Sequence, residues 1–127
     1  MLPKKILIID DEKMIRLTTS ILLKKEGIEV VEAVNGNEGL QKIDQEKPDL
    51  ILLDIMMPIM DGWEVLDNIQ GNENYNSIPV IIFTAGDFIE AEKRAKDKKV
   101  HGIIRKPFRL EKMLEIINLS KENTSNE

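Results

Sequence analysis

Short apolar runs that end in a charged or hydroxyl residue recur along this chain and constrain its fold more than any other feature. KKILIIDD ends in Asp10 and Asp11, DLILLD in Asp54, IPVIIFT in Thr84, and HGIIRK reaches Lys106. Each run has the length and apolar content of a buried β-strand. If these strands lie parallel in one sheet, three carboxylates, a hydroxyl and an amine meet at its carboxyl edge.

Segments with helically spaced apolar residues separate the strands. The expected strands are 6–9, 28–33, 50–53, 80–83 and 100–104, and the expected helices are 12–26, 38–45, 63–69, 88–98 and 110–119. Strict alternation of strands and helices, with continuously apolar strands, is typical of a parallel sheet covered by helices on both faces. We therefore predict an α/β fold, a doubly wound five-stranded parallel sheet in the order 2-1-3-4-5, of the flavodoxin-like (βα)5 type. Ligands in such sheets bind where the strand order reverses, here beside Asp10, Asp11 and Asp54.

The length of 127 residues fits a single domain, predicted over residues 1–119 and followed by a polar tail or the start of a linker over 120–127. The net charge of −5 argues mildly against nonspecific binding to nucleic acid or to an anionic membrane. Because cysteine is absent, disulfides, thiol catalysis and a thiolate metal site are excluded. No signal peptide or membrane-spanning helix is expected, and a cytoplasmic location is the default.

Each polar residue at a strand end has an ordinary structural explanation when it is taken alone. Asp10 or Asp11 could cap the first helix, Asp54 could form a turn, Thr84 could cap the fourth helix, and Lys106 could be a solvated charge. Taken together, three carboxylates within a few ångströms would repel one another by about 4 kcal/mol per close pair at an effective dielectric near 20. A cation is therefore expected to offset them, and a small set of oxygen ligands suits Mg²⁺.

A carboxylate can also act as a nucleophile toward phosphorus and form an acyl phosphate. Phosphoryl transfer needs in-line positioning and positive charge on the equatorial oxygens. Mg²⁺ and Lys106 would supply that charge, and the Thr84 hydroxyl would supply a hydrogen bond. Asp54 is the best candidate nucleophile because it stands alone at its strand end, opposite the pair of aspartates that would hold the metal.

The pieces IIDDE, LLDIMMPIMDG, the Thr-Ala of FTAG and the Lys-Pro-Phe of RKPF occur in this order through the five strand–helix units. With this set the chain resembles a receiver domain of the two-component response-regulator family, similar to chemotaxis regulators, across nearly its whole length. The resemblance implies that a sensor histidine kinase or a phosphotransfer protein phosphorylates Asp54. It also implies that Asp11, Asp54 and the backbone carbonyl of Met56 ligate Mg²⁺ directly, whereas Asp10 acts through a metal-bound water.

The same resemblance implies a conformational switch. Lys106 would contact the phosphoryl group, and its peptide bond to Pro107 would be cis. Thr84 would move toward a phosphoryl oxygen, so that phosphorylation shifts the populations of two states and controls a downstream protein or an output domain. The implied partners include neither nucleic acid nor membrane. The chain would be a monomer or a weak dimer through the face of the fourth helix, fifth strand and fifth helix.

Three positions depart from the pattern of the family. Ile103 stands where the family usually has tyrosine or phenylalanine, three residues before the lysine, so we expect weaker coupling between phosphorylation and that face. Met56 and Gly86 stand where polar side chains in the family can influence the attacking water. Because neither residue can orient water with a side chain, we expect a comparatively persistent phosphoryl-aspartate.

Other functions compete with that of a receiver, which would have no turnover beyond self-phosphorylation and self-dephosphorylation. A metal-dependent phosphatase with an aspartyl nucleophile, of the haloacid-dehalogenase type, would place D-x-D-x-[TV] after its first strand, where this chain has DDEKM. A flavin-binding module on the same fold would need a hydroxyl- and glycine-rich phosphate loop at that place. A pseudo-receiver that binds partners without phosphorylation is disfavoured, because all the phosphorylation residues are present.

Overall fold

The computed structural model describes residues 2–125, and the side chains of these residues as far as residue 119. Strands and helices alternate strictly along the described chain. The strands are β1 (Lys5–Ile9), β2 (Glu29–Ala33), β3 (Leu50–Asp54), β4 (Val80–Thr84) and β5 (Gly102–Arg105), and the helices are α1 (Lys13–Lys25), α2 (Gly36–Glu46), α3 (Gly62–Gln70), α4 (Phe88–Ala95) and α5 (Leu110–Ser125). All neighbouring strands are parallel, in the order β2-β1-β3-β4-β5. The predicted fold class and strand order are therefore confirmed.

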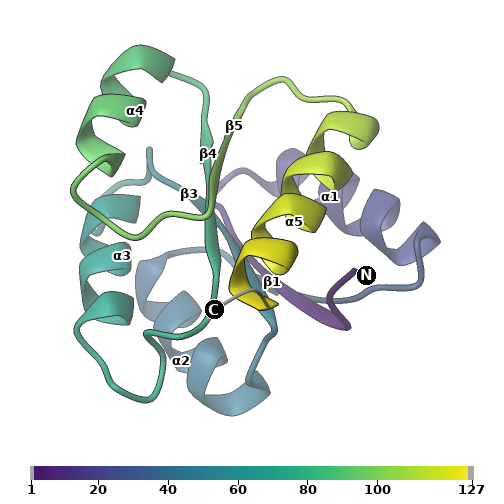
Figure 1. Ribbon diagram of the computed structural model, residues 1–127, viewed down its shortest axis with the longest axis horizontal. Coiled ribbons are helices and arrows are strands. Elements are labelled where there is room, and N and C mark those ends of the chain that lie inside the picture. Colours follow the sequence, from purple (N-terminus) through teal and green to yellow (C-terminus); the bar gives the residue numbers. More distant parts are fainter. Residues whose placement is uncertain (1, 126–127) are drawn as a thin grey trace.

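Helices cover both faces of the sheet, which is seen nearly edge-on in Figure 1. One face carries α2, α3 and α4, and the other carries α1 and α5. The core has one cluster of buried side chains beneath α2, α3 and α4 and another beneath α1 and α5. In β1, Leu7 and Ile9 belong to the former cluster, whereas Ile6 and Ile8 belong to the latter. This alternation follows from the two-residue period of a strand. It explains why the central strands are apolar at every position except Lys5, where β1 begins, and Asp54 and Thr84, where β3 and β4 end.

Side-chain caps begin three of the helices at the carboxyl edge of the sheet. Asn35, Asp61 and Asp87 each accept a hydrogen bond from the backbone N–H three residues further on, at 2.8, 3.0 and 3.0 Å. A cap of this kind satisfies one of the free N–H groups in the first helical turn, and its loss costs about 1 kcal/mol. The starts of α2, α3 and α4 are therefore fixed beside the strand ends that carry the candidate site.

Two expected helix ends were wrong. The last helix was expected to end at Leu119 but continues to Ser125, because the polar residues between them include no glycine or proline to stop it. The helix expected over 88–98 ends at Ala95, whose carbonyl accepts a hydrogen bond from the Lys98 N–H as the chain turns toward β5. The boundary between the domain and a tail at residue 119 stays a prediction.

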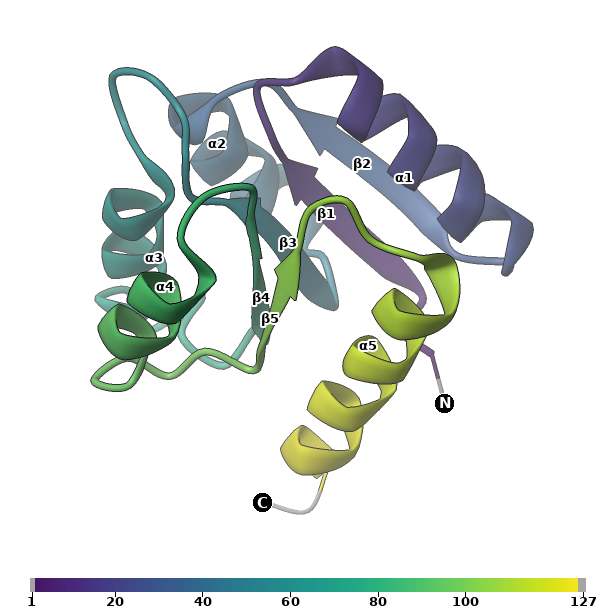
Figure 2. The ribbon, with the colours of Figure 1, turned by 90° about the horizontal axis from the view of Figure 1, so that it is seen from above.

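The two ends of the described chain lie at the amino edge of the sheet. The backbone N–H groups of Lys4 and Lys5 donate to the Asp49 carboxylate at 3.1 and 2.9 Å, where β1 and β3 begin. Helix α5 starts near the carboxyl edge and runs back beside the sheet, so that its last turn also lies at the far end (Figure 2). Among the described residues, no helix is both long enough and apolar enough to cross a membrane.

Candidate functional site

Strand register brings the predicted site residues together. Ile9 of β1 pairs with Leu53 of β3, so that Asp10 and Asp54 follow at neighbouring strand ends. Strand β4 ends at Thr84 beside β3, and β5 leads directly into Lys106 on the other side of β4. All four side chains are buried, with Asp10, Asp54 and Thr84 at most 1 % exposed. The predicted juxtaposition of carboxylates, hydroxyl and amine is thus present.

Lys106 is the cation at the centre of this group. Its Nζ lies 2.8 Å from Asp10 Oδ2, 3.5 Å from Asp54 Oδ1 and 3.4 Å from Glu12 Oε1. Burial disfavours the ammonium, but the hydrogen bond that it donates to Asp10 and the surrounding negative charges outweigh this effect, so the pKa of Lys106 is raised above its ordinary value. Lys106 therefore stays protonated and supplies a fixed positive charge.

The two carboxylate oxygens of Asp54 differ in their hydrogen bonds. Its Oδ1 accepts a hydrogen bond from the Met56 N–H at 3.1 Å. Its Oδ2 is buried and has no hydrogen-bond partner within residues 2–119. Burial and the nearby Asp10 carboxylate raise the pKa of Asp54 to about 7, against the opposing effects of Lys106 and the Met56 amide. A buried oxygen left without a partner is unusual and suggests an absent cation or a reactive group.

Three carboxylates could hold a metal ion together. Ligand oxygens of Asp10, Glu12 and Asp54 lie within 4.8 Å of one another. The all-oxygen donor set and the unpartnered Asp54 Oδ2 fit Mg²⁺, which prefers a few carboxylates and retains water. Asp11 is exposed and is not a member of this group; its predicted role as a direct ligand, like that of the Met56 carbonyl, stays a prediction.

Sequence reasoning missed Glu12 as a member of the site. Its side chain is 56 % exposed and reaches Lys106 from the solvent side. The only available signal was its place directly after the aspartate pair in IIDDE. The suggestion that Asp10 caps the first helix is partly right, because Asp10 Oδ1 accepts a hydrogen bond from the Glu12 N–H at 2.9 Å, and Glu12 is the N-cap of α1.

Arg16 fixes the strand end that carries Asp10, and it too was missed. Its Nη1 donates a hydrogen bond to the Asp10 carbonyl at 2.8 Å, and its Nε lies 3.4 Å from a Glu32 carboxylate oxygen. The Arg16 side chain is only 12 % exposed. Arg16, in α1, therefore links this helix to the end of β1 and to strand β2.

Two hydrogen bonds hold Thr84 in place at the end of β4. Its hydroxyl oxygen accepts a hydrogen bond from the Gly86 N–H at 3.2 Å, and its backbone carbonyl accepts one from the Lys106 N–H at 2.8 Å. The predicted cis peptide bond between Lys106 and Pro107 is confirmed. Thr84 also lines a hollow of about 150 Å³ between α3 and α4, together with Trp63.

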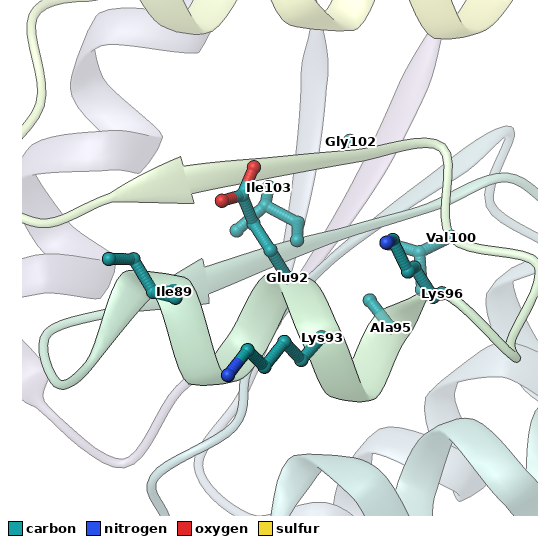
Figure 3. Close-up of a pocket in the computed structure, with 8 residues that line it drawn as sticks. All are labelled: Ile89, Glu92, Lys93, Ala95, Lys96, Val100, Gly102 and Ile103. Carbon is teal, nitrogen blue, oxygen red and sulfur yellow. The ribbon is translucent and has the colours of Figure 1, made fainter.

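Ile103 is a residue of β5, which pairs with β4 on the side away from β3 and Asp54. Ile103 lines a hollow of about 390 Å³ between β5 and α4, and Figure 3 shows Glu92 of α4 reaching over toward it. Ile103 is half-buried and packs against the core cluster on this face of the sheet. The expected weakening of the switch at this aliphatic residue stays a prediction.

The chain matches the family model of the response regulator receiver domain over residues 6–118. It is 36% identical to PilG of Pseudomonas aeruginosa over 110 residues, which cover 87% of this chain and 82% of that protein. It is 33% identical to sporulation initiation phosphotransferase F of Bacillus subtilis over 117 residues, which cover 92% and 93%. Other relatives are longer, and the chain spans 46% of the transcriptional regulator RpaA of Synechocystis, at 38% identity over 110 residues.

Solved structures agree with this relationship. The chain superposes with a TM-score of 0.87 and 31% identity on a CheY-like receiver domain protein from Methanospirillum hungatei, and the match covers 97% of each chain. Receiver domains are signalling modules that exchange signals with kinases or phosphotransfer proteins and with output partners. The sheet order, the strand-end cluster and these matches show that the chain belongs to the family of response regulator receiver domains of two-component and phosphorelay systems.

Proposed function

We propose that Asp54 accepts a phosphoryl group from the histidine of a sensor kinase or phosphotransfer protein, in a reaction that depends on Mg²⁺. One observation carries this proposal. Asp54 Oδ2 is buried, has no hydrogen-bond partner within residues 2–119, and belongs to a carboxylate group beside a fixed ammonium. A carboxylate in this setting has an oxygen ready for attack and positive charge close to where the phosphoryl oxygens would lie.

The residues divide the chemistry among them. The Asp54 oxygen forms a bond to phosphorus while the bond to the donor nitrogen breaks, and the imidazole leaves with that electron pair. Lys106 would turn from Asp10 toward a phosphoryl oxygen, and the Thr84 hydroxyl would donate to another. Bound Mg²⁺ supplies further positive charge, which offsets the carboxylates and the equatorial oxygens of the transferring group.

The metal would be held by Asp11, Asp54 and the Met56 carbonyl, with Asp10 acting through water and Glu12 next to them. Movement of Thr84 would then shift the α4–β5–α5 face between two states and control a downstream protein or output domain. The chain would be a monomer or a weak dimer through this face. A cytoplasmic location stays a prediction from the sequence.

The proposal is tested by incubating the purified chain with acetyl phosphate and Mg²⁺ and then weighing it intact. We expect one added phosphoryl group on the wild-type chain and on Asp97→Asn, a matched control at an exposed aspartate. No addition is expected for Asp54→Asn or in the presence of a chelator. Unchanged labelling of Asp54→Asn would contradict the assignment of the acceptor. Absence of labelling in every sample, including rapidly quenched ones, would contradict the function.

We expect the lifetime of the phosphoryl group on Asp54 to depend on Met56 and Gly86. A Cβ placed on Gly86 would lie 2.9 Å from Met56 Sδ, so the Met56 side chain lies directly over this glycine. Neither residue can orient water toward phosphorus. We expect the double variant Met56→Asn, Gly86→Glu to lose its phosphoryl group about tenfold faster, because positioned polar groups assist attack by water. Intact mass measured after removal of the donor follows the loss. The control Met56→Leu should decay like the wild type, and equal decay of all three proteins would refute this explanation.

A further inference from the structure

Ile59 combines an unfavourable backbone conformation with an almost fully exposed side chain. Its φ is 70°, in the left-handed region that a β-branched side chain rarely adopts. Its side chain is 98% exposed, so it buries no apolar surface against its own fold. Glycine or asparagine would be better suited to this backbone. The strain is therefore retained without a benefit to the folded chain alone.

The loop between β3 and α3 holds Ile59 in this conformation. The Met60 N–H donates to the Pro58 carbonyl at 2.8 Å, and the Gly62 N–H donates to the Ile55 carbonyl at 3.1 Å. The first bond spans Ile59 itself, and the second closes the loop around it. The exposed side chain is consequently presented at a fixed position, five residues after Asp54.

Ile59 lies in the loop that follows Asp54, at the carboxyl edge of the sheet. The exposed surface of this edge, outside the buried polar group, is called the rim of the site. Ile59 lines a hollow of about 250 Å³ together with Asp11 and with Val34, which is 42% exposed. Met14 and Met56, from the segments that follow β1 and β3, are 67% and 61% exposed. Exposed apolar side chains thus gather at the carboxyl edge, around a group of buried polar residues.

A protein that delivers phosphoryl groups must touch this rim. Asp54 is 1% exposed, and reacting atoms must approach to about 3–3.5 Å. A histidine on a folded donor can reach so deep a carboxylate only if the donor surface around it contacts the surrounding loops. A small donor molecule reaches Asp54 without that contact.

We propose that Ile59 is a docking contact for the protein phosphodonor, and that its side chain packs against apolar residues beside the donor histidine. The inference rests on the proposed function. Packing of an exposed apolar side chain into a partner contributes most where it is rigidly held, because little conformational freedom is then lost on binding. The loop hydrogen bonds hold the backbone of Ile59, so this residue meets the condition. A contact with the donor would then explain why the unfavourable backbone conformation is retained.

The chain offers a matched control at Lys47, the other described non-glycine residue with positive φ. Its φ is 48°, and it caps the end of α2. Replacing either residue with glycine relieves left-handed strain, but only Ile59 lies on the rim. The conservative variant Ile59→Leu keeps an apolar side chain at the same place.

The test compares two phosphodonors and the stability of each variant. The protein donor is a phosphorylated histidine phosphotransfer domain, taken from a panel screened on the wild-type chain, and the small donor is acetyl phosphate. For Ile59→Gly we expect kcat/KM with the protein donor to fall about tenfold, mainly through KM, while labelling by acetyl phosphate stays within about twofold. Its urea midpoint should not fall. Lys47→Gly should leave both transfers unchanged, and Ile59→Leu should retain most of the transfer from the protein donor.

Equal transfer from the protein donor to the wild type and Ile59→Gly would overturn the inference and leave the proposed function intact. Equal losses with both donors would also overturn it, since they would indicate a disturbed site and not a lost contact. Transfer to the wild type from no member of the panel, with acetyl phosphate still labelling Asp54, would overturn it as well. Only the absence of all labelling would refute the proposed function itself.

Discussion

Replacing Lys106 with methionine should lower the free energy of unfolding by about 3 kcal/mol at pH 8 without Mg²⁺. The Lys106 ammonium is 2.8 Å from Asp10, which is fully buried, and 3.5 Å from Asp54. Methionine fills a similar volume but leaves two buried carboxylates without a cation. Urea denaturation measures the loss. Adding Asp10→Asn should recover more than half of it, because the variant removes a charge that has lost its partner.

The matched control is Lys98→Met. Lys98 Nζ lies 2.6 Å from an Asp67 carboxylate that is 63% exposed, and such surface pairs contribute about 0–1 kcal/mol. The two lysines therefore have equally short ion pairs but very different surroundings. A similar small loss for both variants would show that the carboxylates near Lys106 are well solvated or already neutral. Mg²⁺ should reduce the difference in stability between Lys106→Met and the wild type, and it should leave the small difference between Lys98→Met and the wild type unchanged.

Replacing Asp54 with asparagine should raise the free energy of unfolding at pH 8, in the absence of Mg²⁺, by about 2–4 kcal/mol. Burial and the Asp10 carboxylate raise the pKa of Asp54 to about 7 in the folded chain, whereas an unfolded aspartate titrates near 3.9. Between these values the folded chain binds the proton more tightly, so stability falls as the pH rises from about 4 to about 7. Asparagine cannot ionise, so the stability of the variant does not fall over this pH range for this reason.

The pH dependence separates this effect from a general change in packing. The gain of Asp54→Asn should vanish near pH 4, where the wild-type carboxyl is protonated in the fold, and should level off above pH 7. Urea denaturation over this range measures it, with exposed Asp97→Asn as the control expected to change by less than about 0.5 kcal/mol. A gain independent of pH would contradict the assigned cause. Mg²⁺ should reduce the gain, because it binds the wild-type carboxylate and stabilises that fold.

Much of the fold could be predicted because the strands are short, apolar and bounded by charge. Leu50 to Asp54 shows this clearly, since every residue is buried and the polar one stands at the strand end. The positions of Asp54, Thr84 and Lys106 follow directly from such strands in a parallel sheet. The types of these three residues, taken together, also indicate phosphoryl transfer.

The details that escaped prediction depend on tertiary contacts or on single backbone angles. Glu12 joins the site only because Lys106, far away in the sequence, reaches toward it. Asp11 carries the same charge as Asp10 but faces outward, and neighbours on a strand end alternate in direction. The positive φ of Ile59 leaves no mark in an apolar, proline-containing loop. The end of α5 escaped because polar residues continue a helix as readily as they begin a tail.

The position of the chain ends has a consequence for how such a module is combined with others. Both ends of the described chain lie at the amino edge of the sheet, separated from Asp54 by the length of the strands. A polypeptide fused before β1 or after α5 would therefore emerge on the side away from the incoming donor. A fusion partner attached there therefore begins at the edge opposite the acceptor. The same geometry makes either end suitable for tethering the chain to a surface while its carboxyl edge stays open to solution.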